Sequence, residues 1–572
     1  MTQARGVGFD RLILHNAIVH TMDDRDSVGE AIGFAGGRVT AVGGREAVRL
    51  ATPGADERDG EGGAVYPGFI DAHHHFCFAA TFAGFPEIRC PPVRQLAEIF
   101  DVVAAEVART PSGQWVVLVG FDEMQLAERR KPTRDELDAV APAHPVLLIH
   151  FTYHEGVLNS LGLRGAGFGE ENADQPGGWL GRTRRGRLNG GVFERCFGRA
   201  EAVARAALLA ADRDAWFARA NAYQERVLAA GITHVCDAAV PPNLEALYRE
   251  WQRRGELRIG VTMMPIADAL LADPAARLVG AATGAREGRL AVGPLKLFLD
   301  GGVQCAMCFS LRDAIGQFGK LIGALLRAPS RVPWRLALQQ RGRLHSDGTI
   351  HTGVLYYDDA ALDRIVAAAA ARGFAIGMHA GGNAAIRQAL ACLERARRGV
   401  LPARIDHFFF VDDDSARRAA QNDVVAVVQP AQLPVTGEWI QHTGLPGRLA
   451  YHGYRQMLEA GISLVGSSDA PVVSFDVLAA IDTAVRRHLR NGATFAPAQR
   501  IGVADALRMY TRNAAAALGL AGEIGQLTPG ARADAVLLSR DPLTVPLEEL
   551  CAIRIRSTFA GRWEQRADSV AR

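Results

Sequence analysis

The chain has 572 residues, and 64 Lys and Arg side chains nearly balance 62 Asp and Glu, which gives a formal net charge of +2. This balance gives no electrostatic reason to expect a nucleic acid or an anionic membrane as the main partner. Hydrophobic residues make up 48 % and charged residues 22 %, which excludes intrinsic disorder as the main state. The eight cysteines are scattered along the chain, as is typical of free thiols in a reducing compartment.

The two ends of the chain have the same kind of sequence pattern, that of short strands and turns. Residues 10–66 contain short alternating strands with glycine turns, and the segment 520–572 contains strands and turns of the same kind. We therefore expect 1–66 and 520–572 to form one composite β-sandwich domain. No apolar run reaches the length of a membrane helix and the start lacks a signal-peptide core, so we expect a cytoplasmic protein without a membrane partner.

Between the two ends, short apolar runs alternate with alanine-rich helical stretches, a pattern typical of βα units around a parallel sheet. The number of these runs is eight, as in a TIM-like (β/α)8 barrel. The runs are residues 68–75, 232–239, 257–264, 293–300, 375–380, 404–410, 424–430 and 463–470. We expect an α/β fold with a barrel over 67–519. Two long intervals interrupt it: an inserted α/β subdomain at about 80–225 and an arginine-rich loop insertion at about 303–352.

The strongest chemical pattern is GFIDAHHH at 68–75. Residues two apart share one face of a strand, so His73 and His75 point the same way and could bind one metal ion, with Asp71 in phase. His74 would point to the other face. A surface histidine cluster is the alternative interpretation, because the chain holds 16 histidines.

Four further candidates lie at or near the ends of other expected strands, where barrel enzymes collect their active-site side chains. They are Lys296, His379, His407 and Asp469. Each alone could be a snorkelling lysine, a satisfied core histidine or a turn aspartate. Their order along the chain and the strand count favour one common site.

The motifs YPGFIDAHHH, LKLFLDGG, MHAGGNAAI, RIDH, VVQP and GSSDAPV resemble the amidohydrolase superfamily. The similarity is specifically to amidohydrolase family 3, the branch that includes N-substituted formamide deformylases, and it spans about 10–565. One departure is Gly382-Asn383, where this branch commonly has Gly-Asp.

The resemblance implies a metal-dependent hydrolase with two divalent ions. His73, His75 and Asp469 would bind one ion and His379 and His407 the other, with Lys296 as a bridging N-carboxylated lysine. Imidazole and carboxylate ligands suit zinc, while manganese, iron or cobalt stay open.

The implied reaction is hydrolysis of an amide-like C–N bond of an N-acyl or N-formyl amine, a carbamate or a cyclic amide. A metal-bridging hydroxide would attack the carbonyl, with Asp469 as general base and then acid. His154 and Asn159, in the family-like YHEGVLNS, are expected at the small-molecule substrate, and an aromatic run after the first strand could line an apolar pocket. An ester hydrolase, a deaminase and a non-catalytic scaffold are the alternatives; a homodimer is expected from base rates.

Overall fold

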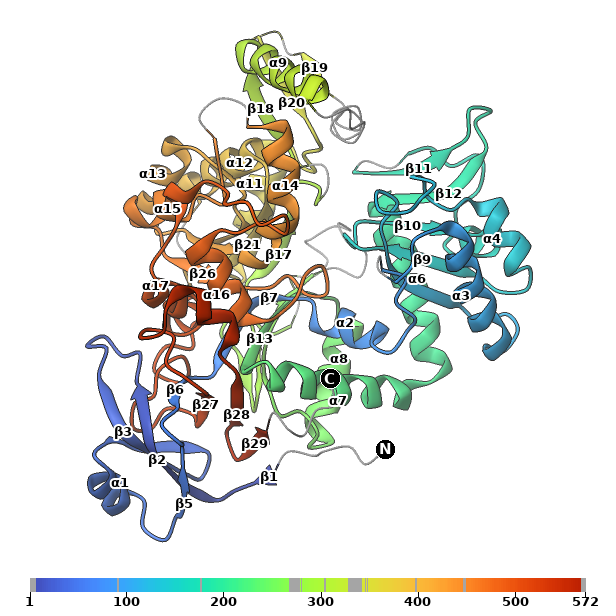
Figure 1. The fold of residues 1–572 in the computed structure, drawn as a ribbon. Coiled ribbons are helices and arrows are strands. Elements are labelled where there is room, and N and C mark those ends of the chain that lie inside the picture. Colours follow the sequence, from blue (N-terminus) through green and yellow to red (C-terminus); the bar gives the residue numbers. More distant parts are fainter. Residues whose placement is uncertain are drawn as a thin grey trace.

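The computed structural model describes residues 7–89, 92–174, 177–266, 278, 280–302, 305–327, 342–344, 346, 348–396, 399–445 and 449–566. It has mixed α/β architecture, with two parallel sheets at its centre, a sheet built from both chain ends and a separate lobe (Figure 1). Within these residues no helix is both long and apolar enough to cross a bilayer.

Two parallel sheets contain all eight strands that the sequence predicts. These eight strands are buried on both faces, which explains the continuous apolar runs in the sequence. The first sheet comprises β7 (Phe69–His74), β13 (Ile232–Val240), β14 (Gly260–Pro265) and β16 (Leu290–Val292), with β15 (Arg286–Glu287) antiparallel at its edge. The second comprises β17 (Leu295–Phe298), β21 (Ile376–Ala380), β22 (Arg404–His407), β24 (Val425–Val428) and β26 (Leu464–Gly466). The sheets touch twice, β14 against β17 and β26 against β7.

Helices connect these strands and pack around them. Asp358, Asp412 and Asp476 begin three of the helices by accepting a backbone N–H from the first turn. The helices are α7 (Arg213–Ala229), α8 (Pro242–Arg253), α11 (Asp359–Ala371), α12 (Asn383–Arg395), α13 (Asp413–Gln421), α14 (Leu433–Thr443), α15 (Tyr454–Glu459), α16 (Val477–Arg486), α17 (Val503–Met509) and α18 (Arg512–Ala517).

Strands from both chain ends share one nine-stranded sheet. β6 pairs with β2 from the N-terminal segment and with β27 from the C-terminal segment, which joins the two ends. Its strands are β1 (Val7–Gly8), β2 (Arg11–His20), β3 (Val28–Ala35), β4 (Arg38–Gly43), β5 (Asp56–Asp59), β6 (Ala64–Pro67), β27 (Asp534–Leu538), β28 (Ile555–Ala560) and β29 (Trp563–Arg566). That this sheet forms a β-sandwich domain over 1–66 and 520–572 stays a prediction.

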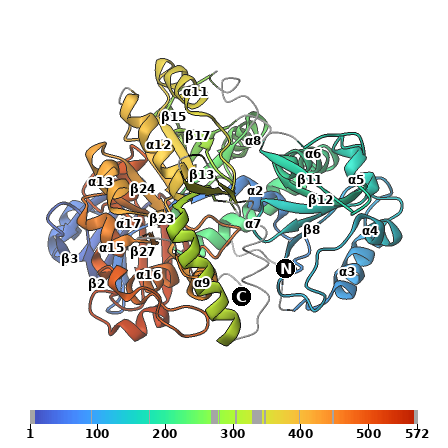
Figure 2. The same ribbon diagram turned by 90° about the horizontal axis from the view of Figure 1, so that it is seen from above.

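The long interval after β7 forms a lobe beside the parallel sheets, as both views show (Figures 1 and 2). Its sheet has the order β11-β12-β10-β9-β8, and only β8 and β9 are parallel. The strands are β8 (Val116–Phe121), β9 (Val146–His150), β10 (Glu155–Leu158), β11 (Gly178–Arg182) and β12 (Leu188–Glu194). The helices are α3 (Leu96–Arg109), α4 (Arg134–Val140), α5 (Ser160–Gly165) and α6 (Arg195–Ala211). We call residues 96–211 the inserted lobe.

The interval 303–352, expected as a loop insertion, contains regular structure where it is described. β18 (Met307–Ser310), β19 (Arg343–Leu344) and β20 (Thr349–Thr352) form an antiparallel sheet, and α9 (Leu311–Arg327) lies beside it. Apolar residues recur in α9 at helical spacing, a signal that the arginine content obscured. Residues 328–341 of this expected insertion lie outside the described part of the chain.

Candidate active site

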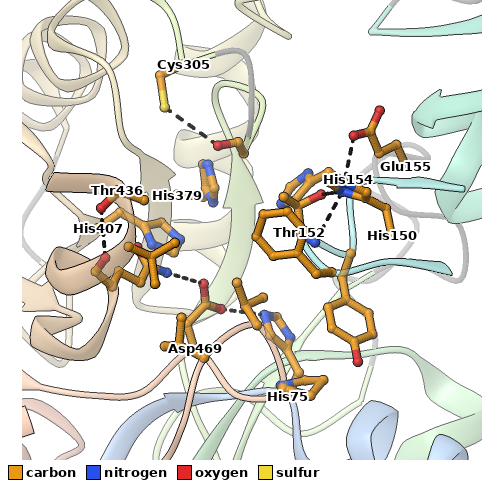
Figure 3. A pocket seen from close by; sticks show the side chains of 18 of the residues that line it. His75, His150, Thr152, His154, Glu155, Cys305, His379, His407, Thr436 and Asp469 are labelled. Atoms are coloured by element: carbon orange, nitrogen blue, oxygen red, sulfur yellow. Dashed lines mark hydrogen bonds and ion pairs between the residues drawn. The ribbon is translucent and has the colours of Figure 1, made fainter. Parts of the chain in front are cut away.

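A cavity of about 1540 Å³ lies where the carboxyl ends of several parallel strands face the inserted lobe. Figure 3 shows the labelled side chains of His379 and His407 on the left, those of Asp469 and His75 below, and those of His150 and His154 on the right. His73 also lines the cavity, whereas Lys296 is only 1 % exposed and does not line it. Five of the six predicted metal ligands therefore face one cavity.

His73, His75 and Asp469 form the first group of donors. Asp469 Oδ1 lies 3.4 Å from His73 Nε2 and 3.2 Å from His75 Nε2, although 394 residues or more separate the aspartate from either histidine along the chain. Burial alone would raise the pKa of Asp469, but hydrogen bonding to the two imidazoles holds it well below its ordinary value. Gln432 donates to Asp469 Oδ2 over 2.9 Å. The carboxylate is thus ionised and oriented.

His379 and His407 lie next to this group. Their ring centroids are 4.3 Å apart, and the ring of His407 is 4.9 Å from that of His73. Burial lowers the pKa of His407 to about 3 and that of His379 well below its ordinary value, so both rings are neutral. A neutral imidazole is the form that binds a metal ion.

Lys296 lies beneath these histidines and contacts a residue that the sequence reasoning missed. Its Nζ donates to Asp406 Oδ2 over 2.5 Å, and the same oxygen lies 3.0 Å from His73 Nδ1. Burial lowers the pKa of Lys296 although Asp406 opposes this effect. Adjacent strand residues normally face opposite ways, but the positive φ of 79° at His407 breaks the alternation, so Asp406 and His407 both reach the site.

Asp71 does not join the donors, although its phase in the strand predicts that it should. The pairing of β7 with β13 is irregular at this point. Asp71 Oδ2 instead lies 2.9 Å from His74 Nδ1, and Asp71 Oδ1 accepts the backbone N–H of Ser468 over 2.9 Å. Tyr223 contacts the other ring nitrogen of His74, which gives His74 a structural position.

Of the two residues expected at the substrate, His154 lies at the cavity and Asn159 does not. His154 lines the cavity, its ring centroid lies 6.1 Å from that of His379, and its Nδ1 lies 2.9 Å from Glu194 Oε2. Asn159 is fully buried and begins α5, where its oxygen accepts two backbone N–H groups and its nitrogen donates to two carbonyls. These four bonds leave Asn159 no polar group for a substrate.

The Gly382-Asn383 departure has a local explanation. Asn383 accepts the backbone N–H of Cys308 over 2.8 Å and donates to the Cys308 carbonyl over 2.7 Å. Its amide therefore fixes β18. Asp300, and not residue 383, places a carboxylate near His379, with Asp300 Oδ1 3.4 Å from His379 Nε2.

The donors fit a bound cation. Ligand atoms of His73, His75 and Asp469 all lie within 4.8 Å of one another. Within the described part of the chain, His379 Nε2 is a buried ring nitrogen without a hydrogen-bond partner. Buried polar atoms normally have partners, so this unpaired nitrogen is consistent with a ligand in the site.

Comparison with known proteins supports the resemblance inferred from the motifs. The sequence profile described as "Amidohydrolase family" matches residues 56–561. N-substituted formamide deformylase of Arthrobacter pascens is 29 % identical over 574 residues, covering 98 % of each chain. An uncharacterized metal-dependent hydrolase of Pyrococcus horikoshii superposes with a TM-score of 0.71 at 22 % identity, covering 94 % of this chain and 99 % of that one. A similar protein of Pyrococcus furiosus gives 0.67 at 22 % identity, covering 93 % and 100 %.

Proposed function

The chain belongs to the amidohydrolase family and is a hydrolase of C–N bonds, and from this premise we propose that it cleaves an amide-like bond in a small N-acyl or N-formyl amine at the cavity described above. One observation carries the proposal. Donor side chains from separate strands, β7, β21 and β22, and from the segment after β26 meet in a single cavity. The 29 % identity to an N-substituted formamide deformylase supports an N-formyl or N-acyl amine over a carbamate or cyclic amide.

We infer that the eight predicted strands of the two parallel sheets form one closed barrel. Contacts between β14 and β17 and between β26 and β7 support closure at both seams. Closure would bring the carboxyl ends of all strands to one rim, where barrel enzymes carry their catalytic side chains. The domain division then follows: 67–519 for the barrel, and 1–66 with 520–572 for the terminal β domain.

Two divalent ions, zinc by ligand type, would occupy the site. His73, His75 and Asp469 would hold one ion and His379 and His407 the other. Lys296, N-carboxylated, would bridge them. Burial favours the uncharged amine that reacts with carbon dioxide, which supports this role for Lys296. When bound, such ions polarise a carbonyl and lower the pKa of water towards neutrality.

Asp469 would move the proton in this reaction. Its carboxylate is ionised, and Gln432 and two imidazoles hold it in place at the cavity wall. It accepts a proton from the attacking water and returns it to the leaving nitrogen, because an amine leaves poorly as an anion. A group positioned in this way typically contributes about 10²–10⁴ to the rate.

His154 would contact the substrate from the inserted lobe. Glu194 can only accept a hydrogen bond and therefore holds the proton on His154 Nδ1, which leaves Nε2 directed away from it. Aromatic side chains of the same cavity, Phe78, Phe82 and Tyr153, contact one another and offer an apolar surface. This lining favours an apolar or aromatic substituent on the substrate nitrogen.

The proposal is tested with purified protein loaded with Zn²⁺ and assayed against N-alkyl and N-benzyl formamides, acetamides, carbamates, lactams and matched esters. We expect turnover of formamides or acetamides and about two ions per chain. Metal-loaded protein that turns over only esters, or none of the panel, would contradict the C–N assignment. Lys296→Ala should lose turnover and regain part of it with short-chain carboxylic acids. An unimpaired Lys296→Ala protein would contradict the bridging role.

A further inference from the structure

A second group of metal-type donors lies on the inserted lobe's wall of the cavity. Asp122 and Glu123 directly follow β8, and His150 ends β9, its parallel neighbour. Parallel neighbours end at the same edge of a sheet, which brings these side chains together. Their ligand atoms all lie within 4.8 Å of one another and all three residues line the cavity. We propose that Asp122, Glu123 and His150 bind a divalent cation of the zinc type, separate from the proposed catalytic ions.

His150 is held in the orientation of a metal ligand. Its Nδ1 lies 3.1 Å from Glu155 Oε1 and 2.7 Å from Thr152 Oγ1, as the close view shows (Figure 3). The backbone N–H of Thr152 also lies 3.4 Å from Nδ1, and Nε2 faces Glu123. With an ion bound, the ring proton would lie on Nδ1 and donate to Glu155, and the Nε2 lone pair would face the ion. Metal-binding histidines typically donate their other ring N–H to a carboxylate in this manner.

Glu123 supplies the independent sign of a ligand. It is 8 % exposed, and its Oε2 has no hydrogen-bond partner among the described residues. The nearest charged or ring atom is His150 Nε2 at 3.2 Å. Two ligands of a tetrahedral ion, at bond lengths of about 2.0–2.1 Å, lie roughly 3.4 Å apart. The observed spacing is therefore close to that of two donors sharing one ion.

The charges around the cluster also favour a divalent cation. Asp122, Glu123 and Glu155 carry three negative charges, against the single positive charge of Lys131 when the imidazole is neutral. Lys131 Nζ contacts Glu155 and lies 3.7 Å from Glu123 Oε1, so it leaves Glu123 Oε2 available. A divalent ion would cancel the two excess charges in a mostly buried cluster, where uncompensated charge is costly.

Three protein donors leave part of the coordination shell open. Because all three residues line the cavity, the open positions would face it and take water or an oxygen atom of a bound molecule. The alternative is a protonated imidazole between Glu123 and Glu155 with no ion bound. The two alternatives differ in metal content, which experiments can measure directly.

The decisive measurement is anomalous diffraction from crystals of the full chain equilibrated with ZnCl₂, recorded above and below the zinc absorption edge. We expect an anomalous peak between Glu123 Oε2 and His150 Nε2. Absence of this peak would overturn the proposal, whether or not zinc appears at His73 and His75. A peak here without catalytic zinc would support this site and contradict the proposed function.

The site is also tested in solution. The protein is stripped of metal with a chelator, reloaded with Zn²⁺ and passed through gel filtration, and the zinc that it retains is then measured. Glu123→Gln and His150→Ala should each retain one zinc per chain fewer than the unmodified protein. Glu87→Gln is the matched control: Glu87 lines the same cavity outside the cluster, and this variant should retain all the zinc. Unchanged zinc in a Glu123→Gln protein with native circular dichroism would overturn the proposal; the crystal measurement decides if the variant does not fold.

Discussion

Lys296 and Asp406 form a fully buried ion pair, with Nζ 2.5 Å from Oδ2, that joins β17 to β22 across the intervening strand β21. Arg404 contacts the other carboxylate oxygen of Asp406 at 2.6 Å. With Lys296 unmodified, Asp406 is thus the shared counter-charge of two buried cations. The same carboxylate lies 3.0 Å from His73 Nδ1, so it connects the buried charges to the proposed metal ligands.

In the metal-free protein, whose Lys296 is not carboxylated, Asp406→Asn should destabilise the fold by about 3–5 kcal/mol, because it leaves Lys296 and Arg404 buried without a counter-charge. Urea unfolding at pH 7 measures the loss. The control is the double variant Lys296→Met/Asp406→Asn. Its loss of unfolding free energy should be smaller than the sum of the losses in the two single variants. Additive effects of the two substitutions would contradict direct coupling between the residues.

The sequence could predict the strands and most of the polar side chains that gather at the cavity, because period-two alternation and strand ends follow from local pattern. His73, His75, His379 and Asp469 all lie at the cavity as expected. Asp406 shares the face of His379, its partner in the neighbouring strand, but the strand register that reveals this comes only from the structure. His407 reaches the site through its positive φ, which the sequence could not predict either. Asn159 occurs in a motif that suggests function, yet all its polar atoms bond to backbone, a fact that only tertiary structure reveals.

Asp469→Asn should reduce kcat for amides by about 10²–10⁴, because the leaving nitrogen loses its proton donor. Esters need less protonation of the leaving group, so a matched ester should lose less activity. Comparison of kcat for an amide and an ester of the same acyl group measures this difference. Equal losses for the two substrates would contradict proton delivery by Asp469 and favour a role in metal binding alone.

Gly302→Ala should weaken substrate binding through His154. A Cβ at Gly302 would lie 2.2 Å from His154 Nε2, so the imidazole must move. If His154 hydrogen-bonds the substrate, KM should rise about tenfold, the equivalent of about 1.4 kcal/mol, with zinc content unchanged. His154→Gln should give a similar rise. Gly316→Ala is the matched control, since nothing lies within 4 Å of its Cβ position. An unchanged KM in Gly302→Ala would contradict contact between His154 and substrate.

Asn383→Asp should leave metal content unchanged, because the side chain bonds to the Cys308 backbone and not to a histidine. The carboxylate loses the donor to the Cys308 carbonyl, so we expect destabilisation of about 1–3 kcal/mol. Zinc analysis and thermal unfolding measure the two effects separately. A gain or loss of zinc in this variant would show that position 383 acts on the metal site despite its contacts with β18.

Glu136, in the inserted lobe, should make the free energy of unfolding depend on pH independently of the proposed metal ions. Hydrogen bonding to Arg130 and to Thr133 at the start of α4 lowers the pKa of Glu136 from 4.5 to about 2, against the opposing effect of burial. The folded state therefore binds this proton less readily than the unfolded state, and the carboxylate stabilises the fold above pH 4.5. This contribution is lost as pH falls from 4.5 towards about 2.

Glu136→Gln should therefore be less stable than the unmodified protein at pH 7, and the difference should shrink as pH falls through that window. Urea unfolding of both proteins from pH 7 to pH 3, followed by a probe in the inserted lobe, measures the difference. Glu171→Gln provides a control, because Glu171 lies in the same lobe and makes no contact with Arg130 or Thr133. A difference between Glu136→Gln and the unmodified protein that is independent of pH would show that Glu136 stabilises α4 without its charge.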